Sequence, residues 1–177
     1  MTEQSAPGIT RFAVTSSVPY GTFDGRAFVR IEGRVTGELP ADAAIAGLDR
    51  AARNARGRIE YSAPFVLVVP REKAAGNGAL LVDVPNRGRP ITHHLYNSPR
   101  TPFVALDTFD TGNGFLQAQG FGVAMLQWEL GHGIALPAFT DEDGRTRYVE
   151  GAGIVAIRDF AAFLRHAPTD AAGTPNP

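Results

Sequence analysis

The pattern of hydrophobic and polar positions divides the chain into a strand-rich first half and a second half in which strands and helices alternate. Residues 27–31 alternate as a strand does, with Phe28 on one face and Val29 and Ile31 on the other. A turn is expected before this strand at residues 19–21, Pro-Tyr-Gly. The pattern of the first half of the chain therefore predicts β-strands.

Residues 57–70 predict one long strand or two short strands separated at Pro64. The dipeptide Asn77-Gly78 is typical of a hairpin turn, and residues 80–84 predict the strand that follows it. Because the connections are short, we expect the strands of residues 9–84 to be mostly antiparallel.

A βαβ unit is predicted from residue 80 onward. Residues 113–120 carry a short helix signal that ends at a glycine, and residues 121–128 form an apolar strand. Residues 151–166 give the strongest helix pattern of the chain. We expect its buried face to hold the residues at helical spacing, flanked by Phe160 and Phe163; they are Ile154, Ile157, Ala161 and Leu164.

The connecting segments predict different roles. Residues 89–110 form a long, irregular, proline-containing segment directly after a central strand, the position at which α/β folds place binding loops. Residues 140–149 predict a charged turn between two short strands. We expect residues 1–8 and 167–177 to be flexible tails around a single domain of residues 9–166.

The composition of the 177 residues is that of an ordinary globular domain, with 44% hydrophobic and 20% charged residues. A net charge of −1 gives no electrostatic reason to expect nucleic acid or an anionic membrane as a partner. The absence of cysteine excludes disulfides, zinc–thiolate sites and a cysteine nucleophile. Residues 1–8 lack the basic and apolar regions of a signal peptide, so we expect a cytoplasmic protein.

Five segments carry a sequence resemblance. They are residues 53–62 (Arg-Asn-Ala-Arg-Gly-Arg-Ile-Glu-Tyr-Ser), 81–88 (Leu-Val-Asp-Val-Pro-Asn-Arg-Gly), 110–116, 119–121 and 156–164. Together they resemble the N-terminal part of a bacterial family, the α/β hydrolase domain-containing proteins, over about residues 33–166. The resemblance implies a serine-hydrolase fold with esterase-like acyl transfer, in which a serine elbow follows the last helix. No Gly-x-Ser-x-Gly occurs in the chain, so no residue is assigned a catalytic role.

The turn after residues 80–84 is the sharpest candidate for a functional site. In the fold that the resemblance implies, the loop after this strand donates a backbone N–H to the oxyanion hole. Asn86, Arg87 and Gly88 are therefore the oxyanion and substrate-loop candidates, and Gly88 allows close approach of the backbone to a ligand. The alternative, which the residue types alone favour, is a tight strand-ending turn in which Arg87 pairs with a nearby carboxylate.

Other candidate chemistry is weaker. Trp128 at the end of the next strand and His132 after it are candidates for a pocket rim, although a tryptophan there is more often a packing residue. The adjacent His93 and His94 would face opposite sides of a strand, and no metal-binding motif is present, so we expect no metal. The glycine pairs lack the third glycine of a dinucleotide fingerprint, and no cofactor is expected.

These patterns predict an α/β chain with a partial α/β-hydrolase-like fold, in which antiparallel strands lead into a βαβ unit and the half that carries the nucleophile is absent. The first hypothesis is an N-terminal fragment of a serine hydrolase for a small-molecule ester. Alone it would be inactive, and it would join a C-terminal half or self-associate through an unpaired apolar edge near Leu126. The alternative is a stand-alone, non-catalytic module that binds a ligand or a protein through residues 89–110. In a third hypothesis, a separately encoded chain carries the serine.

Overall fold

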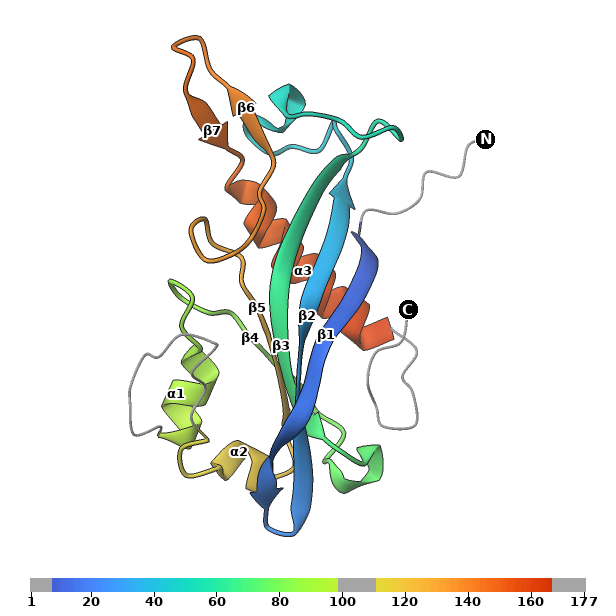
Figure 1. Ribbon diagram of the computed structural model, residues 1–177, viewed down its shortest axis with the longest axis vertical. Helices are drawn as coiled ribbons and strands as arrows, with labels where there is room; N and C mark the ends of the chain where they lie inside the picture. The colour runs from blue at the N-terminus through green and yellow to red at the C-terminus, as the bar shows by residue number, and fades with distance from the viewer. Residues whose placement is uncertain (1–7, 99–110, 167–177) are drawn as a thin grey trace.

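Within residues 8–98 and 111–166, which the computed structural model describes, a five-stranded mixed sheet carries three α-helices on its faces (Figure 1). The strands, whose order in the sheet is β1-β2-β3-β5-β4, are β1 (Gly8–Phe23), β2 (Arg26–Leu39), β3 (Ile59–Pro70), β4 (Leu80–Asp83) and β5 (Gly122–Leu126). The helices are α1 (Ile91–Asn97), α2 (Phe115–Ala118) and α3 (Gly151–His166), with single 3-10 turns η1 (Leu48–Arg50) and η2 (Lys73–Ala75). A small separate hairpin pairs β6 (Ala138–Thr140) with β7 (Thr146–Tyr148), as predicted. The prediction of a mixed α/β chain is confirmed.

The two longest strands form a hairpin whose turn lies later than the sequence indicates. β1 continues to Phe23, and the two-residue turn is Asp24-Gly25, with φ angles of 47° and 76°. Positive φ at both central residues matches the type I′ turn that suits the twist of a hairpin. The predicted turn at residues 19–21 is wrong. β1 is an edge strand, where Pro19 is tolerated without an N–H, and a register shift after it absorbs the irregularity.

The connection from β3 to β4 is not the hairpin that Asn77-Gly78 indicates. β3 is one continuous strand, and β5 lies between β3 and β4, antiparallel to the first and parallel to the second. The Asn77 side chain instead holds the approach to β5, because its Nδ2 donates to the Gln119 carbonyl at 2.9 Å. The predicted βαβ unit is confirmed. The predicted free edge at Leu126 is wrong, because the edges of the described sheet are β1 and β4.

α3 covers one face of β1, β2 and β3 and has the predicted bounds (Figure 1). Ile157, Leu164 and the flanking Phe160 and Phe163 pack against the core as predicted, but Ile154 does not. Ile154 is 64% exposed, whereas Ala156 and Phe160 are fully buried. Small residues let the helix lie close to the segment after β5, since a Cβ at Gly153 would lie 2.1 Å from the Trp128 carbonyl oxygen. Periodicity favours the larger side chains, so the predicted buried face is wrong at Ile154.

A buried polar pair fastens α3 to the sheet. The Tyr61 hydroxyl on β3 donates to Asp159 Oδ2 at 3.1 Å, and Arg158 bonds the other carboxylate oxygen at 3.0 Å. Burial, followed by the charge of Asp159, raises the pKa of Tyr61, so the hydroxyl keeps its proton and remains a donor. The pair therefore fixes the position of the helix along β3.

Two short helices lie against the opposite face of the sheet. α2 contributes Leu116 to a second core cluster with Phe28 and Met125, and α1 packs against α2 and β4. The prediction of irregular structure is therefore wrong for residues 91–97, which form α1. The remainder of that segment, residues 99–110, lies outside the described residues, as do most of the predicted tails.

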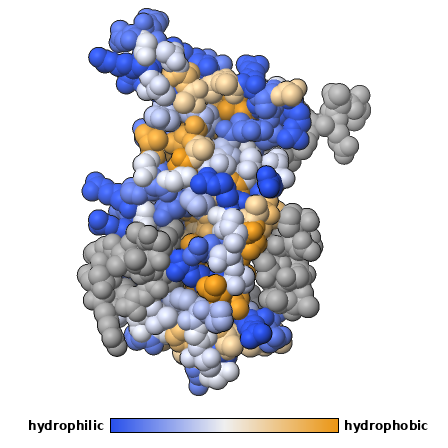
Figure 2. Space-filling view, in the orientation of Figure 1, coloured by the Kyte–Doolittle hydropathy of each residue, from blue (hydrophilic) through white to orange (hydrophobic). Residues whose placement is uncertain are grey.

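The outer surface mixes polar and apolar regions. Hydrophobic side chains reach the surface in separate patches between polar ones in the view of Figure 2. Separate patches of this kind are ordinary for a protein surface. In the part of the chain that is described, no helix is both long enough and apolar enough to cross a membrane.

Candidate functional site

A tight turn projects from the carboxyl end of β4, where parallel strands of α/β sheets commonly carry ligand sites. Asn86 and Arg89 exchange both backbone hydrogen bonds, at 3.0 Å and 3.1 Å. Between them, Arg87 and Gly88 have φ angles of 52° and 72°, as the central residues of a type I′ turn require. A non-glycine residue in this left-handed region costs about 1–2 kcal/mol, so Arg87 is held against its local preference.

Three consecutive residues that follow β5 anchor this turn. Gln127 Nε2 donates to the Gly88 carbonyl at 3.3 Å, and the Trp128 indole N–H donates to the Pro85 carbonyl at 2.7 Å. The Glu129 carboxylate accepts the backbone N–H of Arg87. Because β4 and β5 are parallel neighbours, their carboxyl ends bring the two segments together. The turn is therefore held rigidly from one side.

Most backbone N–H groups of the turn already donate hydrogen bonds within the protein. Asn86, Arg87 and Arg89 each donate within the protein. The Gly88 N–H makes no hydrogen bond to any residue that the structure describes, although Gly88 is buried. Gly88 is therefore the residue of this turn whose N–H is available to a ligand.

A buried carboxylate fixes the base of the loop at the end of β4. Asp83 accepts the N–H groups of Ile91 at 3.1 Å and Thr92 at 2.7 Å, at the start of α1. Burial raises the pKa of Asp83, against the lowering effect of these hydrogen bonds. Pro90, the N-cap residue of α1, has no side-chain acceptor, so Asp83 takes the capping role.

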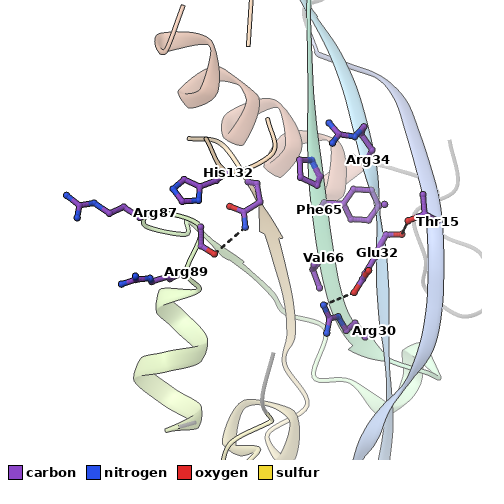
Figure 3. Close-up of a pocket in the computed structure, with 13 residues that line it drawn as sticks. Thr15, Arg30, Glu32, Arg34, Phe65, Val66, Arg87, Arg89 and His132 are labelled. Carbon is purple, nitrogen blue, oxygen red and sulfur yellow. Dashed lines mark hydrogen bonds and ion pairs between the residues drawn. The ribbon is translucent and has the colours of Figure 1, made fainter. Parts of the chain in front are cut away.

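A pocket with a volume of about 750 Å³ lies between this turn and the strands β1, β2 and β3 (Figure 3). Its volume is typical of sites for small molecules. The turn meets another loop at the pocket, since a Cβ on Gly88 would lie 2.6 Å from His132 Nδ1. The described residues that line the pocket are Thr15, Arg30, Glu32, Gly33, Arg34, Pro64, Phe65, Val66, Arg87, Gly88, Arg89, Gln127 and His132.

The described lining is positively charged, with four arginines and one carboxylate, Glu32. Arg30 forms an ion pair with Glu32 at 2.6 Å. Arg34 bonds two neutral acceptors, the Ser62 hydroxyl at 3.1 Å and the Gly133 carbonyl at 3.2 Å. Since the whole chain has a net charge of −1, the positive charge is concentrated here, which favours an anionic ligand.

The structure brings some of the predicted site residues together and separates others. Arg87, Gly88 and His132 line the pocket, whereas Asn86 and Trp128 are not among its lining residues. The Asn86 backbone closes the turn, and Trp128 anchors it. Within the described ranges the Arg87 guanidinium makes no ion pair. The Glu129 carboxylate instead accepts a hydrogen bond from the backbone N–H of Arg87. The oxyanion and pocket-rim roles of these residues remain predictions.

Sequence reasoning missed Arg30 and Arg34. The available signal was the alternation of residues 30–34, Arg-Ile-Glu-Gly-Arg, which places three charged side chains on one face of β2 and Ile31 on the other. Nothing local marks that charged face as part of a pocket, because the turn that completes the pocket follows two strands later.

A nucleophile with its base is not assembled among the described residues. The Ser62 hydroxyl accepts a hydrogen bond from Arg34, and no described serine bonds to a histidine side chain. His93 is buried in α1, where its Nδ1 lies 3.3 Å from Asn97 Nδ2. Over the same residues, no group of three His, Asp or Glu side chains is placed to hold a metal ion.

Comparison with known proteins yields a weak structural likeness. No protein-family model and no curated protein matches the chain. The chain is similar to a solved structure of LipA, a rice cell wall degrading esterase from Xanthomonas oryzae, with a TM-score of 0.33 and 15% sequence identity. The match covers 86% of this chain and 38% of the esterase chain, so this chain spans well under half the length of that protein. A likeness at this TM-score is no argument for a shared fold or activity.

Proposed function

We propose that this chain provides the first half of the sheet of an α/β-hydrolase-like domain for esterase-type acyl transfer, and that the turn of residues 86–89 binds the oxyanion of a small ester. The observation that carries the proposal is the Gly88 N–H, which lies in a rigid turn beside a small-molecule pocket and has no acceptor among the described residues. A donor that is fixed before the reaction stabilises the charge that develops on the carbonyl oxygen of the substrate.

The order of the strands supports the same reading. β4 is at a free edge of the described sheet, and its carboxyl end leads into the turn. Leu80 at its start and Val84 just after it are 38% and 48% exposed. A further parallel strand paired with β4 would end beside the turn, where a strand-to-helix elbow presents a nucleophilic serine. In this proposal the serine and its base come from another segment or another chain.

Ester hydrolysis tests the need for such a partner. We expect the pure chain to hydrolyse p-nitrophenyl acetate no faster than a heat-denatured control, because no described serine has a base. Sequencing the DNA beyond the codon for Pro177 should reveal a Gly-x-Ser-x-Gly elbow, and co-production with that segment should restore turnover. Turnover by the pure chain would contradict the proposal, and so would the absence of an elbow both from the sequence that continues this chain and from the next open reading frame.

The role of the turn is tested by Gly88→Ala in the active assembly. The added Cβ would crowd His132 and strain a positive φ, which displaces the N–H donor. Loss of one oxyanion donor lowers kcat by about 10²–10³-fold. Gly131→Ala is the matched control, since Gly131 has a φ of 84° and open space around its Cβ position. Equal turnover in the two variants would remove the turn from the mechanism.

A stand-alone binding module is the second candidate. It is favoured by the pocket, whose walls are supplied by described residues, whereas a nucleophile is not. A module of this kind would be a monomer that melts cooperatively and binds a ligand without converting it. A half-sheet would instead expose β4 and self-associate. Sedimentation and calorimetry on the pure chain distinguish the two candidates.

A further inference from the structure

We propose that the pocket recognises its ligand through a carboxylate or phosphate group, and that Arg34 on β2 binds this group. The inference names a substrate class for the proposed function. That the ligand is an ester rests on the proposed function. Binding of the anionic group itself requires no catalysis. The argument depends on how Arg34 is held, on the other charges of the pocket and on the distance to the turn.

Arg34 is oriented without being neutralised. Its guanidinium donates to the Ser62 hydroxyl at 3.1 Å and to the Gly133 carbonyl at 3.2 Å. Neither acceptor carries a charge, and no carboxylate in residues 8–98 or 111–166 forms an ion pair with Arg34. Arginine has more N–H donors than these two bonds use. The bonds therefore fix the planar group and leave donors for a bidentate contact with a carboxylate or phosphate.

The other charged residues of the lining are less suited than Arg34 to bind the anionic group of the ligand. Glu32 pairs with Arg30 at 2.6 Å, so these two charges compensate each other. Arg87 and Arg89 belong to the opposite wall, and Figure 3 shows their side chains pointing away from β2. The Arg87 guanidinium makes no ion pair with a described residue and adds positive potential on that side, which attracts an anion over a distance. Arg34 is thus an arginine of the lining that two neutral acceptors orient and that no described carboxylate neutralises.

Arg34 and the turn contact the same loop from opposite walls of the pocket. Gly133, whose carbonyl holds Arg34, is the neighbour of His132, and His132 lies against Gly88. One short loop therefore joins the anion site to the N–H that is proposed to bind an ester oxygen. Pro64 lines the same pocket and offers apolar surface to the rest of the ligand. This arrangement suits a short molecule with an anionic group at one end and an ester at the other.

Binding of two related esters tests the inference. Monoethyl succinate and diethyl succinate differ in one free carboxylate, and each can be titrated into the pure chain while amide NMR signals are followed. We expect the monoester to bind at least about tenfold more tightly, with the preference declining as salt is raised. Inorganic phosphate is titrated in parallel. Stronger binding of phosphate or of the monoester identifies the preferred anionic group, and either order supports the inference.

Three variants show whether Arg34 is responsible. Arg34→Gln should remove the preference for the monoester. Glu32→Gln should raise the affinity for the monoester several-fold, because it releases the charge of Arg30, and this variant keeps the test valid if Arg34→Gln does not fold. Arg145→Gln, in the exposed β6–β7 turn, is the control and should bind like the unchanged chain. Equal binding of the two esters, a preference that survives Arg34→Gln, or no binding of any probe would overturn the inference.

The inference and the proposed function fail separately. Anion binding that depends on Arg34, together with turnover that is unaffected by Gly88→Ala, contradicts acyl transfer at this turn and leaves the anion site standing. Turnover that depends on Gly88, together with equal affinity for the two esters, contradicts the anion site alone.

Discussion

At the scale of single residues, Arg87 occupies a backbone conformation that asparagine adopts more easily. Its φ of 52° lies at the first central position of a type I′ turn, where asparagine is preferred. We expect Arg87→Asn to raise the free energy of unfolding by about 1 kcal/mol, measured by urea denaturation. Arg89→Asn, outside the left-handed region, is the control and should not stabilise. A less stable Arg87→Asn would mean that the arginine side chain contributes more than the strain removes.

Asp83 makes stability depend on pH. Burial holds its pKa in the folded protein above the value of 3.8 that applies to the unfolded chain. A raised carboxyl pKa means that the folded state binds the proton more tightly. Asp83 therefore contributes most to stability below pH 3.8, and this contribution is lost as pH rises through the folded pKa.

Asp83→Asn provides a reference that does not titrate. The free energy of unfolding of the parent, minus that of Asp83→Asn, should fall as pH rises through this window and then become constant. Chemical denaturation at a series of pH values measures the difference. A difference that grows with pH would show that the hydrogen bonds from the start of α1 outweigh burial.

At the scale of the elements, the packing of α3 depends on a glycine. Gly→Ala inside a helix normally stabilises by about 1 kcal/mol. At Gly153 the added methyl group would meet the Trp128 carbonyl, so we expect destabilisation by about 1–3 kcal/mol, measured as a lower Tm. Ile154→Ala, on the exposed side of the same helix, should stay within about 0.5 kcal/mol of the parent. A larger effect at Ile154 would mean that the helix packs on the face that periodicity predicts.

The same helix shows what sequence patterns can predict. Its bounds follow from local signals, because apolar spacing and a basic last turn are properties of the helix itself. Its buried face depends on a close approach to the segment after β5, which no local pattern contains. Asn77-Gly78 fails as a hairpin signal for a related reason, since the position between β3 and β4 is taken by a strand that comes later.

The candidate site also has one part that the sequence predicts and one part that it does not. Gly88 is identifiable from sequence because the run Pro-Asn-Arg-Gly shortly after a strand is a local turn signal. Arg34 is not, because its partners Ser62 and Gly133 are brought to it by strand pairing and by a distant loop. Local chemistry therefore predicts the turn, and tertiary structure creates the charged wall opposite it.

At the scale of the whole molecule, stability is unevenly distributed. β3 is buried along most of its length and pairs with strands on both sides. The β6–β7 hairpin has three residues in each strand, and β7 is exposed throughout. We expect amide hydrogens of β3 to exchange only through global unfolding and those of β6–β7 to exchange fastest. Native-state hydrogen exchange followed by NMR measures this, and equal protection of both would contradict it.

The anchoring of the turn by Trp128 has an optical consequence. Trp128 is the single tryptophan of the chain, and its indole is bonded to the Pro85 carbonyl beside the pocket. Tryptophan emission from this protein therefore arises at the site alone, without a background from elsewhere in the chain. A compound that shifts the turn changes the surroundings of the indole and hence the emission maximum. The protein carries its own label-free reporter, with which compound collections can be screened for ligands before any substrate is known.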